Sequence, residues 1–129
     1  MTSKLSVDTI QGVSQAGNIT IQGEGTAETN LQQGLAKAWL QGTTSAGLSD
    51  SFNISGGTDV GTGEYTYAIS NNMANNQWSQ TCNAIAHELV QVKNTTLITS
   101  AISVAVFTRA DSISVADAVH FVTLHGDLA

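Results

Sequence analysis

Apolar residues recur at every second position in short stretches of this sequence, and that spacing limits the fold more than any other feature. The segment Tyr65–Ile69 (YTYAI) shows it clearly, and in Val119–Leu124 (VHFVTL) two alternating sets of residues follow each other. A period of two is typical of a β-strand with one buried face. Clusters of glycine, asparagine and serine end the stretches at the spacing of strands in sandwiches and barrels. The sequence therefore predicts an all-β fold, an antiparallel β-sandwich, with a jelly-roll-like arrangement as one version of it.

The main domain, residues 34–129, is expected to hold roughly seven or eight short strands. They are expected at 35–41, around 52–54, at 65–69, along 81–92, along 95–109 as one strand or two, and at 119–124. Loops are expected at 42–50, 71–80 and 111–118. The predicted packing side consists of Phe52, Ile54, Tyr65, Tyr67 and Ile69, and Trp39 is assigned to the core.

Residues 1–33 differ from the rest of the chain. Two short apolar segments, Leu5–Ile10 and Ile19–Ile21, read as strands, and the polar stretch Gly23–Gly34 as a linker with room for one helical turn. Two strands of this length cannot build a core of their own. We expect an N-terminal arm that anchors the domain to another protein or to a neighbouring copy. The anchoring side chains would be those of Leu5, Val7, Ile10, Ile19 and Ile21.

Charge is scarce, and this excludes several partners. Only 11% of the residues are charged, against about 25% in an average globular chain, and the net charge is −6. The four basic residues are scattered, whereas nucleic-acid binding needs clustered cations, so we expect no nucleic-acid partner. No apolar stretch is long enough to cross a bilayer and the N-terminus lacks a signal peptide, so we expect no membrane partner and assembly in a cytoplasm.

The glycine-rich segment Gly56–Gly63 superficially resembles a phosphate-binding loop. A P-loop needs a lysine after its last glycine and then a helix, whereas here Glu64 and the strand-like Tyr65–Ile69 follow. An EF-hand calcium loop would need acidic residues at alternate positions after Asp59, and these are missing. We therefore expect a strand–turn–strand unit, with Asp59 and Glu64 flanking the connection.

Histidine patterns do not predict a metal site within one chain. His87-Glu88 opens a HExxH-like motif, but Gln91 stands where the second zinc-binding histidine is required. His120 and His125 are five positions apart, which puts them on opposite faces of a strand. Equivalent histidines of several copies meeting on a symmetry axis stay open as an alternative. We expect no metal, no cofactor and no catalytic residues.

The remaining reactive or aromatic residues have simple structural explanations. Cys82 is the only cysteine and fits a small buried hydrophobe. Most aspartates stand next to turns, where their side chains bond to local backbone. Trp78 lies in the polar segment Asn71–Gln80, and we expect it to be an exposed aromatic that binds a sugar or a partner protein.

Several segments resemble structural proteins of tailed phages, especially marine and cyanobacterial phages. These segments are SKLSVDTIQG and NITIQG within residues 3–23, GTAETNLQQGLAKAW at 25–39, DSFNISGGTDVGTGEYTYAIS at 50–70 and VHFVTLHGDLA at 119–129. Together they cover about two-thirds of the chain, and the segment at 50–70 is the most specific of them.

The resemblance implies a non-enzymatic virion component that binds other virion proteins and forms a homotrimer. A small domain with an N-terminal arm suits a capsid decoration protein first, and a tail fibre or tail adaptor second. A receptor- or carbohydrate-binding module that recognises a host surface glycan is the alternative of another class, with Trp78, Tyr65 or Tyr67 as stacking residues. A small hydrolase would need a cluster of carboxylates or a histidine–serine pair in a cleft.

Overall fold

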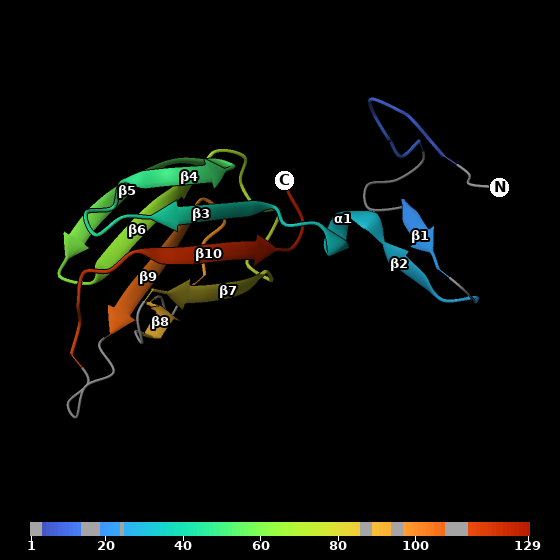
Figure 1. Cartoon of the computed structure of the whole chain (residues 1–129). Helices are drawn as coiled ribbons and strands as arrows, with labels where there is room; N and C mark the ends of the chain where they lie inside the picture. Colours follow the sequence, from blue (N-terminus) through green and yellow to red (C-terminus); the bar gives the residue numbers. More distant parts are fainter. Residues whose placement is uncertain (1–3, 14–18, 24, 86–88, 94–96, 108–113) are drawn as a thin grey trace.

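The computed structural model describes residues 4–13, 19–23, 25–85, 89–93, 97–107 and 114–129. Within these ranges the chain forms ten β-strands and one short helix (Figure 1). The strands are β1 (Thr20–Gln22), β2 (Glu28–Asn30), β3 (Ala38–Gly42), β4 (Leu48–Phe52), β5 (Ile54–Gly61), β6 (Glu64–Ile69), β7 (Ser79–Ala84), β8 (Leu89–Val92), β9 (Ala101–Phe107) and β10 (His120–His125). The helix α1 (Leu31–Gly34) lies between β2 and β3.

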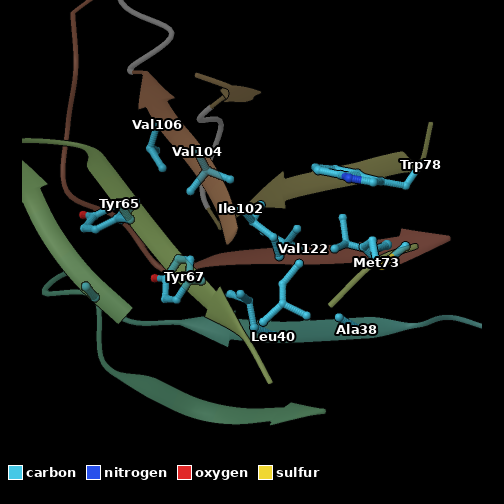
Figure 2. Packing of buried hydrophobic residues seen from close by; sticks show 14 residues of the cluster. Ala38, Leu40, Tyr65, Tyr67, Met73, Trp78, Ile102, Val104, Val106 and Val122 are labelled. Atoms are coloured by element: carbon cyan, nitrogen blue, oxygen red, sulfur yellow. The ribbon is translucent and has the colours of Figure 1, made fainter. Parts of the chain in front are cut away.

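Eight of these strands build two four-stranded sheets. The first sheet has the order β4-β3-β10-β7 and the second sheet the order β5-β6-β9-β8, and all pairings in both are antiparallel. The inner faces of the two sheets contribute to one buried cluster (Figure 2). The expected all-β fold is confirmed, and the arrangement is consistent with a β-sandwich. The jelly-roll-like version stays a prediction.

Along β6, alternation places the core residues as the sequence predicts. Leu40 of β3 and Val122 and Leu124 of β10 point inward from the first sheet, and Tyr65, Tyr67 and Ile69 of β6 from the second. The central strand β9 adds Ile102, Val104 and Val106, and all nine side chains are at most 5% exposed. Burying a side chain of this size stabilises the fold by roughly 1.5–3 kcal/mol, so this layer dominates the stability of the domain.

Phe52 departs from the expected packing side, and the reason is a corner in the backbone. Asn53 has φ +58, a left-handed conformation, and it separates β4 in the first sheet from β5 in the second. The corner reverses the alternation: Ile54 packs against the core, whereas Phe52 points outward and is 52% exposed. The prediction that both residues share one inner face is therefore wrong.

The side chain of Asn53 holds this corner. Its Nδ2 donates to the backbone carbonyls of Lys37 (3.0 Å) and Asn71 (3.1 Å), and its Oδ1 accepts a hydrogen bond from the amide of Asn71 (2.7 Å). Asparagine tolerates the left-handed region better than most residues and supplies both a donor and an acceptor. The crossing from one sheet to the other thus has a specific chemical cause.

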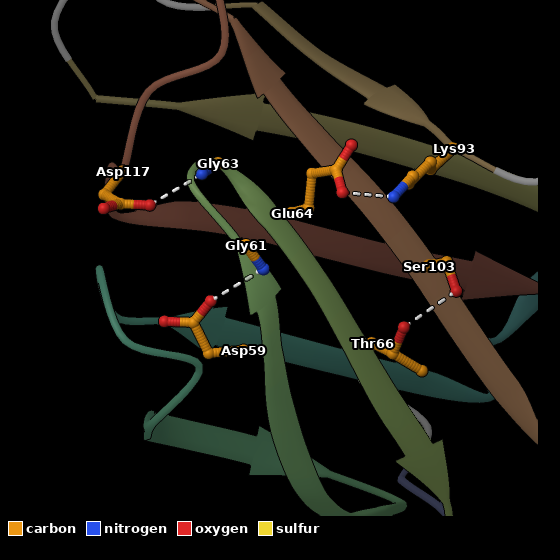
Figure 3. A network of polar contacts seen from close by, with 8 residues as sticks. All are labelled: Asp59, Gly61, Gly63, Glu64, Thr66, Lys93, Ser103 and Asp117. Atoms are coloured by element: carbon orange, nitrogen blue, oxygen red, sulfur yellow. Dashed lines mark hydrogen bonds and ion pairs between the residues drawn. The ribbon is translucent and has the colours of Figure 1, made fainter.

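The glycine-rich segment forms the hairpin that the sequence predicts. β5 pairs with β6, and Thr62 and Gly63 make the turn, with Gly63 at φ +68. Asp59 accepts a hydrogen bond from the amide of Gly61, and Glu64 forms an ion pair with Lys93 (Figure 3). A side chain at Gly63 would also meet the backbone of Val106 and Ala116. The glycine therefore serves the turn and its close packing.

The segment Asn71–Gln80 closes one end of the sandwich. Met73 forms a β-bridge with Leu128. The amide of Ala74 donates to the carbonyl oxygen of Asp127, and the amide of Ala129 donates to the carbonyl oxygen of Asn72. These bonds tie the segment to the C-terminal residues. Trp78 and Met73 are thereby packed into the core, at 8% and 2% exposure. A segment that composition marks as a surface turn is thus part of the folded body.

The N-terminal arm contains less regular structure than expected at its start and more near its end. Residues 4–13 form no strand, so the predicted strand at Leu5–Ile10 is wrong; a strand needs a hydrogen-bonding partner, and β1 pairs with β2 instead. The strand at 19–21 is confirmed as β1, and the helical turn as α1, which begins where Asn30 Oδ1 accepts from the amide of Gln33. Figure 1 shows this hairpin and α1 at one end of the sandwich.

Other boundaries shift by a few residues. The expected loop at 42–50 already contains the start of β4, and the stretch at 81–92 divides between β7 in the first sheet and β8 in the second. The stretch at 95–109 contains β9 at Ala101–Phe107. His87, Glu88 and Asp111 lie outside the described residues.

We expect Asn53→Ala to destabilise the domain by about 2–3 kcal/mol, because it removes three hydrogen bonds and because alanine tolerates a positive φ less well than asparagine does. Chemical denaturation monitored by circular dichroism measures the change. Asn53→Gly should lower the free energy of unfolding by less, since glycine adopts a positive φ without strain. The control is Asn72→Ala, an exposed neighbour, which should stay within about 0.5 kcal/mol of wild type. Equal effects at positions 53 and 72 would contradict the role of the corner.

Candidate functional site

The outer face of the first sheet carries the largest exposed aromatic side chains of the sandwich. Trp39 of β3 lies directly opposite Phe52 of β4, and Phe121 lies on the next strand, β10, diagonal to Trp39. Cross-strand neighbours on one face are about 5 Å apart and diagonal neighbours about 7–8 Å, within reach of aromatic rings. The three side chains are 37%, 52% and 38% exposed for Trp39, Phe52 and Phe121 respectively. They lie on the same face of three neighbouring strands, and we call the three residues the aromatic strip.

Short polar side chains surround this strip. The register places Gln41 beside Asp50 and Phe121, Thr123 beside Trp39 and Thr81, and Asn83 beside Phe121. We call the set the aromatic face; its members are Trp39, Gln41, Asp50, Phe52, Thr81, Asn83, Phe121 and Thr123. Asp50 is the only residue among them with a formal charge. The face can therefore offer apolar contact and neutral hydrogen bonds, but it cannot attract an anion.

A second group of polar side chains lies inside the sandwich. Tyr67 OH and His120 Nε2 are 2.8 Å apart, and His120 Nδ1 lies 2.8 Å from the carbonyl oxygen of Ala118. A carbonyl can only accept, so Nδ1 carries the proton and donates to Ala118, while Nε2 accepts from the Tyr67 hydroxyl. The ring of Tyr65 stacks on His120 with centroids 4.6 Å apart.

Asp117 connects the same region to the β5–β6 turn. Its Oδ1 accepts from the Tyr65 hydroxyl (3.0 Å) and from the amide of Gly63 (2.6 Å, Figure 3). These contacts span more than fifty residues of sequence, so this aspartate is not one of those that bond only to local backbone. Burial and the hydrogen bond to Asp117 raise the pKa of Tyr65, which keeps the hydroxyl protonated as a donor.

This buried group joins the two sheets in the core. His120 is fully buried, and burial lowers its pKa although the hydrogen bond to Ala118 acts in the opposite direction. A β-carbon at Gly42 would collide with His120 Nε2 and the Tyr67 hydroxyl, so the space around the ring is filled. Burial likewise raises the pKa of Tyr67 and of the half-buried Cys82 thiol, which disfavours the reactive thiolate.

The histidines follow the geometry expected of a strand. His120 faces the core and His125 the outer side of β10, so they lie on opposite faces as predicted. A metal site on a symmetry axis between copies could not use His120, because its ring is enclosed. In the part of the chain that the structure describes, no three histidine, cysteine or carboxylate side chains gather as metal ligands would.

A polar cavity of about 380 Å³ lies where α1 meets the end of the sandwich. Its walls are Gln33, Gln77, Trp78, Ser79, His125, Gly126 and Asp127. Trp78 Nε1 has no hydrogen-bond partner and is buried away from solvent. It therefore does not present its donor to the open part of this cavity.

The two tryptophans exchange the places that the sequence analysis gave them. Trp78 was expected to be an exposed binding aromatic, but it is 8% exposed and packs with Met73; this prediction is wrong because the C-terminal residues pin its segment to the core. Trp39 was expected in the core but faces outward, since Ala38 and Leu40 take the inner positions. Tyr65 and Tyr67 are buried, so neither can stack on a ligand.

The expected anchor residues of the arm lie apart from the core cluster. Leu5, Val7, Ile10 and Ile21 are between 53% and 79% exposed, and Ile19 is half-buried. Val13, which the sequence analysis did not select, is fully exposed. The apolar side chain of Val13, which follows the first apolar segment of the arm, could have indicated it as a further anchor residue. The aromatic face was also missed, because alternation along β3 and β10 puts apolar residues on both sides and does not tell which side is inner.

We expect His120 to make stability pH-dependent. Burial lowers the pKa of His120, so the folded state takes up a second ring proton less readily than the unfolded state, where the pKa of histidine is about 6.5. The free energy of unfolding therefore falls as the pH drops below about 6.5, by up to about 1.4 kcal/mol per pH unit. Urea titrations between pH 8 and pH 5 should therefore show the gap between wild type and His120→Gln narrowing towards acid. The control Thr123→Val, on the outer side of the same strand, should differ from wild type equally at every pH. A constant gap for His120→Gln would refute the assignment.

Among the described residues, no helix is of the length and apolarity needed to span a membrane. No protein-family model, no curated protein and no solved structure matches this chain.

Proposed function

We propose that this chain is a non-enzymatic structural protein of a bacteriophage virion, in the first instance a capsid decoration protein. It would dock on the particle through its N-terminal arm and associate with its own copies. The observation that carries the proposal is the contrast between a closed sandwich and an arm whose apolar side chains have no place in its core. The sequence resemblance to phage structural proteins supports the same function.

The arm is built like a segment that completes its structure on a partner. Leu5 and Val7 are alternate residues and are 79% and 53% exposed, and their segment forms no strand within the chain. An extended segment of this kind can add a strand to the edge of another protein's sheet, with apolar side chains entering pockets. Binding would then remove from water the apolar surface that the free chain exposes.

The body is suited to repeated packing on a particle. Its charge content is low, so few like charges oppose contact between copies. Many arms bound to one shell would act together, and such multivalence gives firm attachment even where a single contact is weak. We propose that the protein forms a homotrimer of jelly-roll-like domains. The trimer would be assembled in the host cytoplasm and become part of the virion.

Two other functions compete with decoration, one of a related kind and one of another class. A tail fibre or tail adaptor protein would use the same arm on a different part of the particle. A carbohydrate-binding module is favoured by one specific observation, the aromatic face with Trp39 at its centre. It would take a glycan there, and not at the buried Trp78, Tyr65 or Tyr67.

Co-sedimentation tests whether the arm anchors the protein: the purified protein is mixed with virions from which this protein has been removed. The wild-type chain should pellet with the particles, and a chain lacking residues 1–30 should stay in the supernatant while its circular dichroism still shows a folded β-domain. The full-length variant with Leu5→Ser, Val7→Ser and Ile10→Ser should lose at least about ten-fold in affinity, because it keeps the arm but removes its apolar contacts.

A matched full-length control is Val60→Ser, which removes an apolar side chain of similar exposure (56%) from the sandwich. It should bind as wild type does. Unchanged binding by the shortened chain would rule out the arm as the anchor. Antibody labelling of intact particles separates the two locations: regular labelling over heads supports decoration, and labelling confined to tails favours the fibre or adaptor function.

A further inference from the structure

We infer that the aromatic face is the surface through which one copy of this chain binds another. The inference rests on the proposed function and concerns contact between neighbouring copies; two identical faces packed on each other form a two-fold pair, so this contact is separate from the threefold contacts of the proposed homotrimer. The face lies on the outside of the first sheet and is formed by β4, β3, β10 and β7. The occupant is the same face of a second copy, packed sheet against sheet.

The composition of the face matches the anatomy of a protein interface. Such interfaces have an aromatic, uncharged centre and a polar rim. Here Trp39, Phe52 and Phe121 form the centre, while Gln41, Thr81, Asn83 and Thr123 surround it with groups that hydrogen-bond without charge. Tryptophan at the centre of a patch is among the residues that contribute most to binding.

The distribution of charge favours a second copy as the occupant. The chain carries a net charge of −6, which opposes most contacts between copies. On the aromatic face, however, Asp50 is the only formally charged residue, and it lies on the edge strand β4. Two copies can therefore meet here with few carboxylates brought together. Association through this face should change little with salt.

The size of the face sets the strength of the contact. Four strands about 4.8 Å apart and three outward rows about 6.8 Å apart give a face of about 400 Å² per copy. Two stacked faces would bury about 800 Å² in total, which is in the range of weak, transient interfaces. A fully exposed aromatic side chain has roughly 150–250 Å² of surface. At their exposed fractions, the three aromatic side chains together present about 250 Å² to solvent. The pair should thus be weak in solution and become significant where copies are held side by side.

The outer face of the second sheet lacks this character and serves as the internal comparison. Its side chains include Thr66 and Ser103, whose hydroxyls bond to each other at 3.0 Å, and the ion pair of Glu64 with Lys93 (Figure 3). These polar groups already satisfy one another, and Phe107, the aromatic residue of β9 on this side, lies at the end of the strand and is half-buried. Apolar contact between copies is therefore favoured on the first sheet.

Sedimentation velocity of the full-length protein from about 10 µM to about 1 mM tests the inference over the range that a weak contact needs. Wild type should shift to larger species with concentration, and Trp39→Ala should weaken the association constant at least about 30-fold. Thr123→Glu adds a carboxylate beside Trp39 without removing an aromatic ring, and it should have a similar effect. The control Val60→Ser, on the second sheet, should associate as wild type does.

Tryptophan fluorescence gives a second readout that needs no variant. Trp78 is buried at every concentration, so a shift of the emission to shorter wavelength on association would report Trp39 leaving water. Wild type that stays monomeric throughout, or variants that associate as wild type does, would overturn the inference. Loss of binding to a glycan array in Trp39→Ala, with unchanged sedimentation, would assign the face to a carbohydrate and overturn it too. Particle binding through the arm is measured separately, so failure here leaves the proposed function standing.

Discussion

The hydrogen bond between Tyr67 and His120 joins the two sheets through the middle of the core. Tyr67 belongs to β6 of the second sheet and His120 to β10 of the first, and both are central strands. In a site closed to water, an unpaired hydroxyl or ring nitrogen would cost a substantial part of the stability of a domain of this size. The bond therefore fixes which residues of the two sheets face each other. Gly42 and the stacked ring of Tyr65 enclose it, so the position of the strands and the filling of the core depend on one another.

A second constraint, the left-handed corner at Asn53, determines what the outside of the molecule presents. The corner allows the chain to leave the first sheet after β4 and enter the second at β5. Because it reverses the alternation, Phe52 stays on the outer side next to Trp39. The aromatic face is thus a consequence of the same bonds that make the sandwich close. A single asparagine links the architecture of the body to the surface that we assign to contact between copies.

The molecule divides its tasks between an arm and a body. Within the body, Asp117 accepts hydrogen bonds from Gly63 and Tyr65, and the C-terminal residues close the end that holds Trp78. The arm leaves apolar side chains in water, an arrangement that is unfavourable until a partner covers them. In our proposal the arm attaches the protein to the particle and the aromatic face links neighbouring copies. Attachment and lateral contact would then be separable by mutation.

The sequence by itself determined the all-β class, the strand at β6 and the hairpin at Gly56–Gly63, because local alternation and turn chemistry decide these features. It also indicated the arm as a segment unable to form a core. Alternation could not tell which side of β3 is inner, because Trp39 and Leu40 are both apolar. Only the tertiary structure decided that Trp78 is buried and Trp39 exposed. The reason is that the deciding contacts, at Asn53 with Asn71 and at Met73 with Leu128, join residues far apart in the chain, and no local pattern records them.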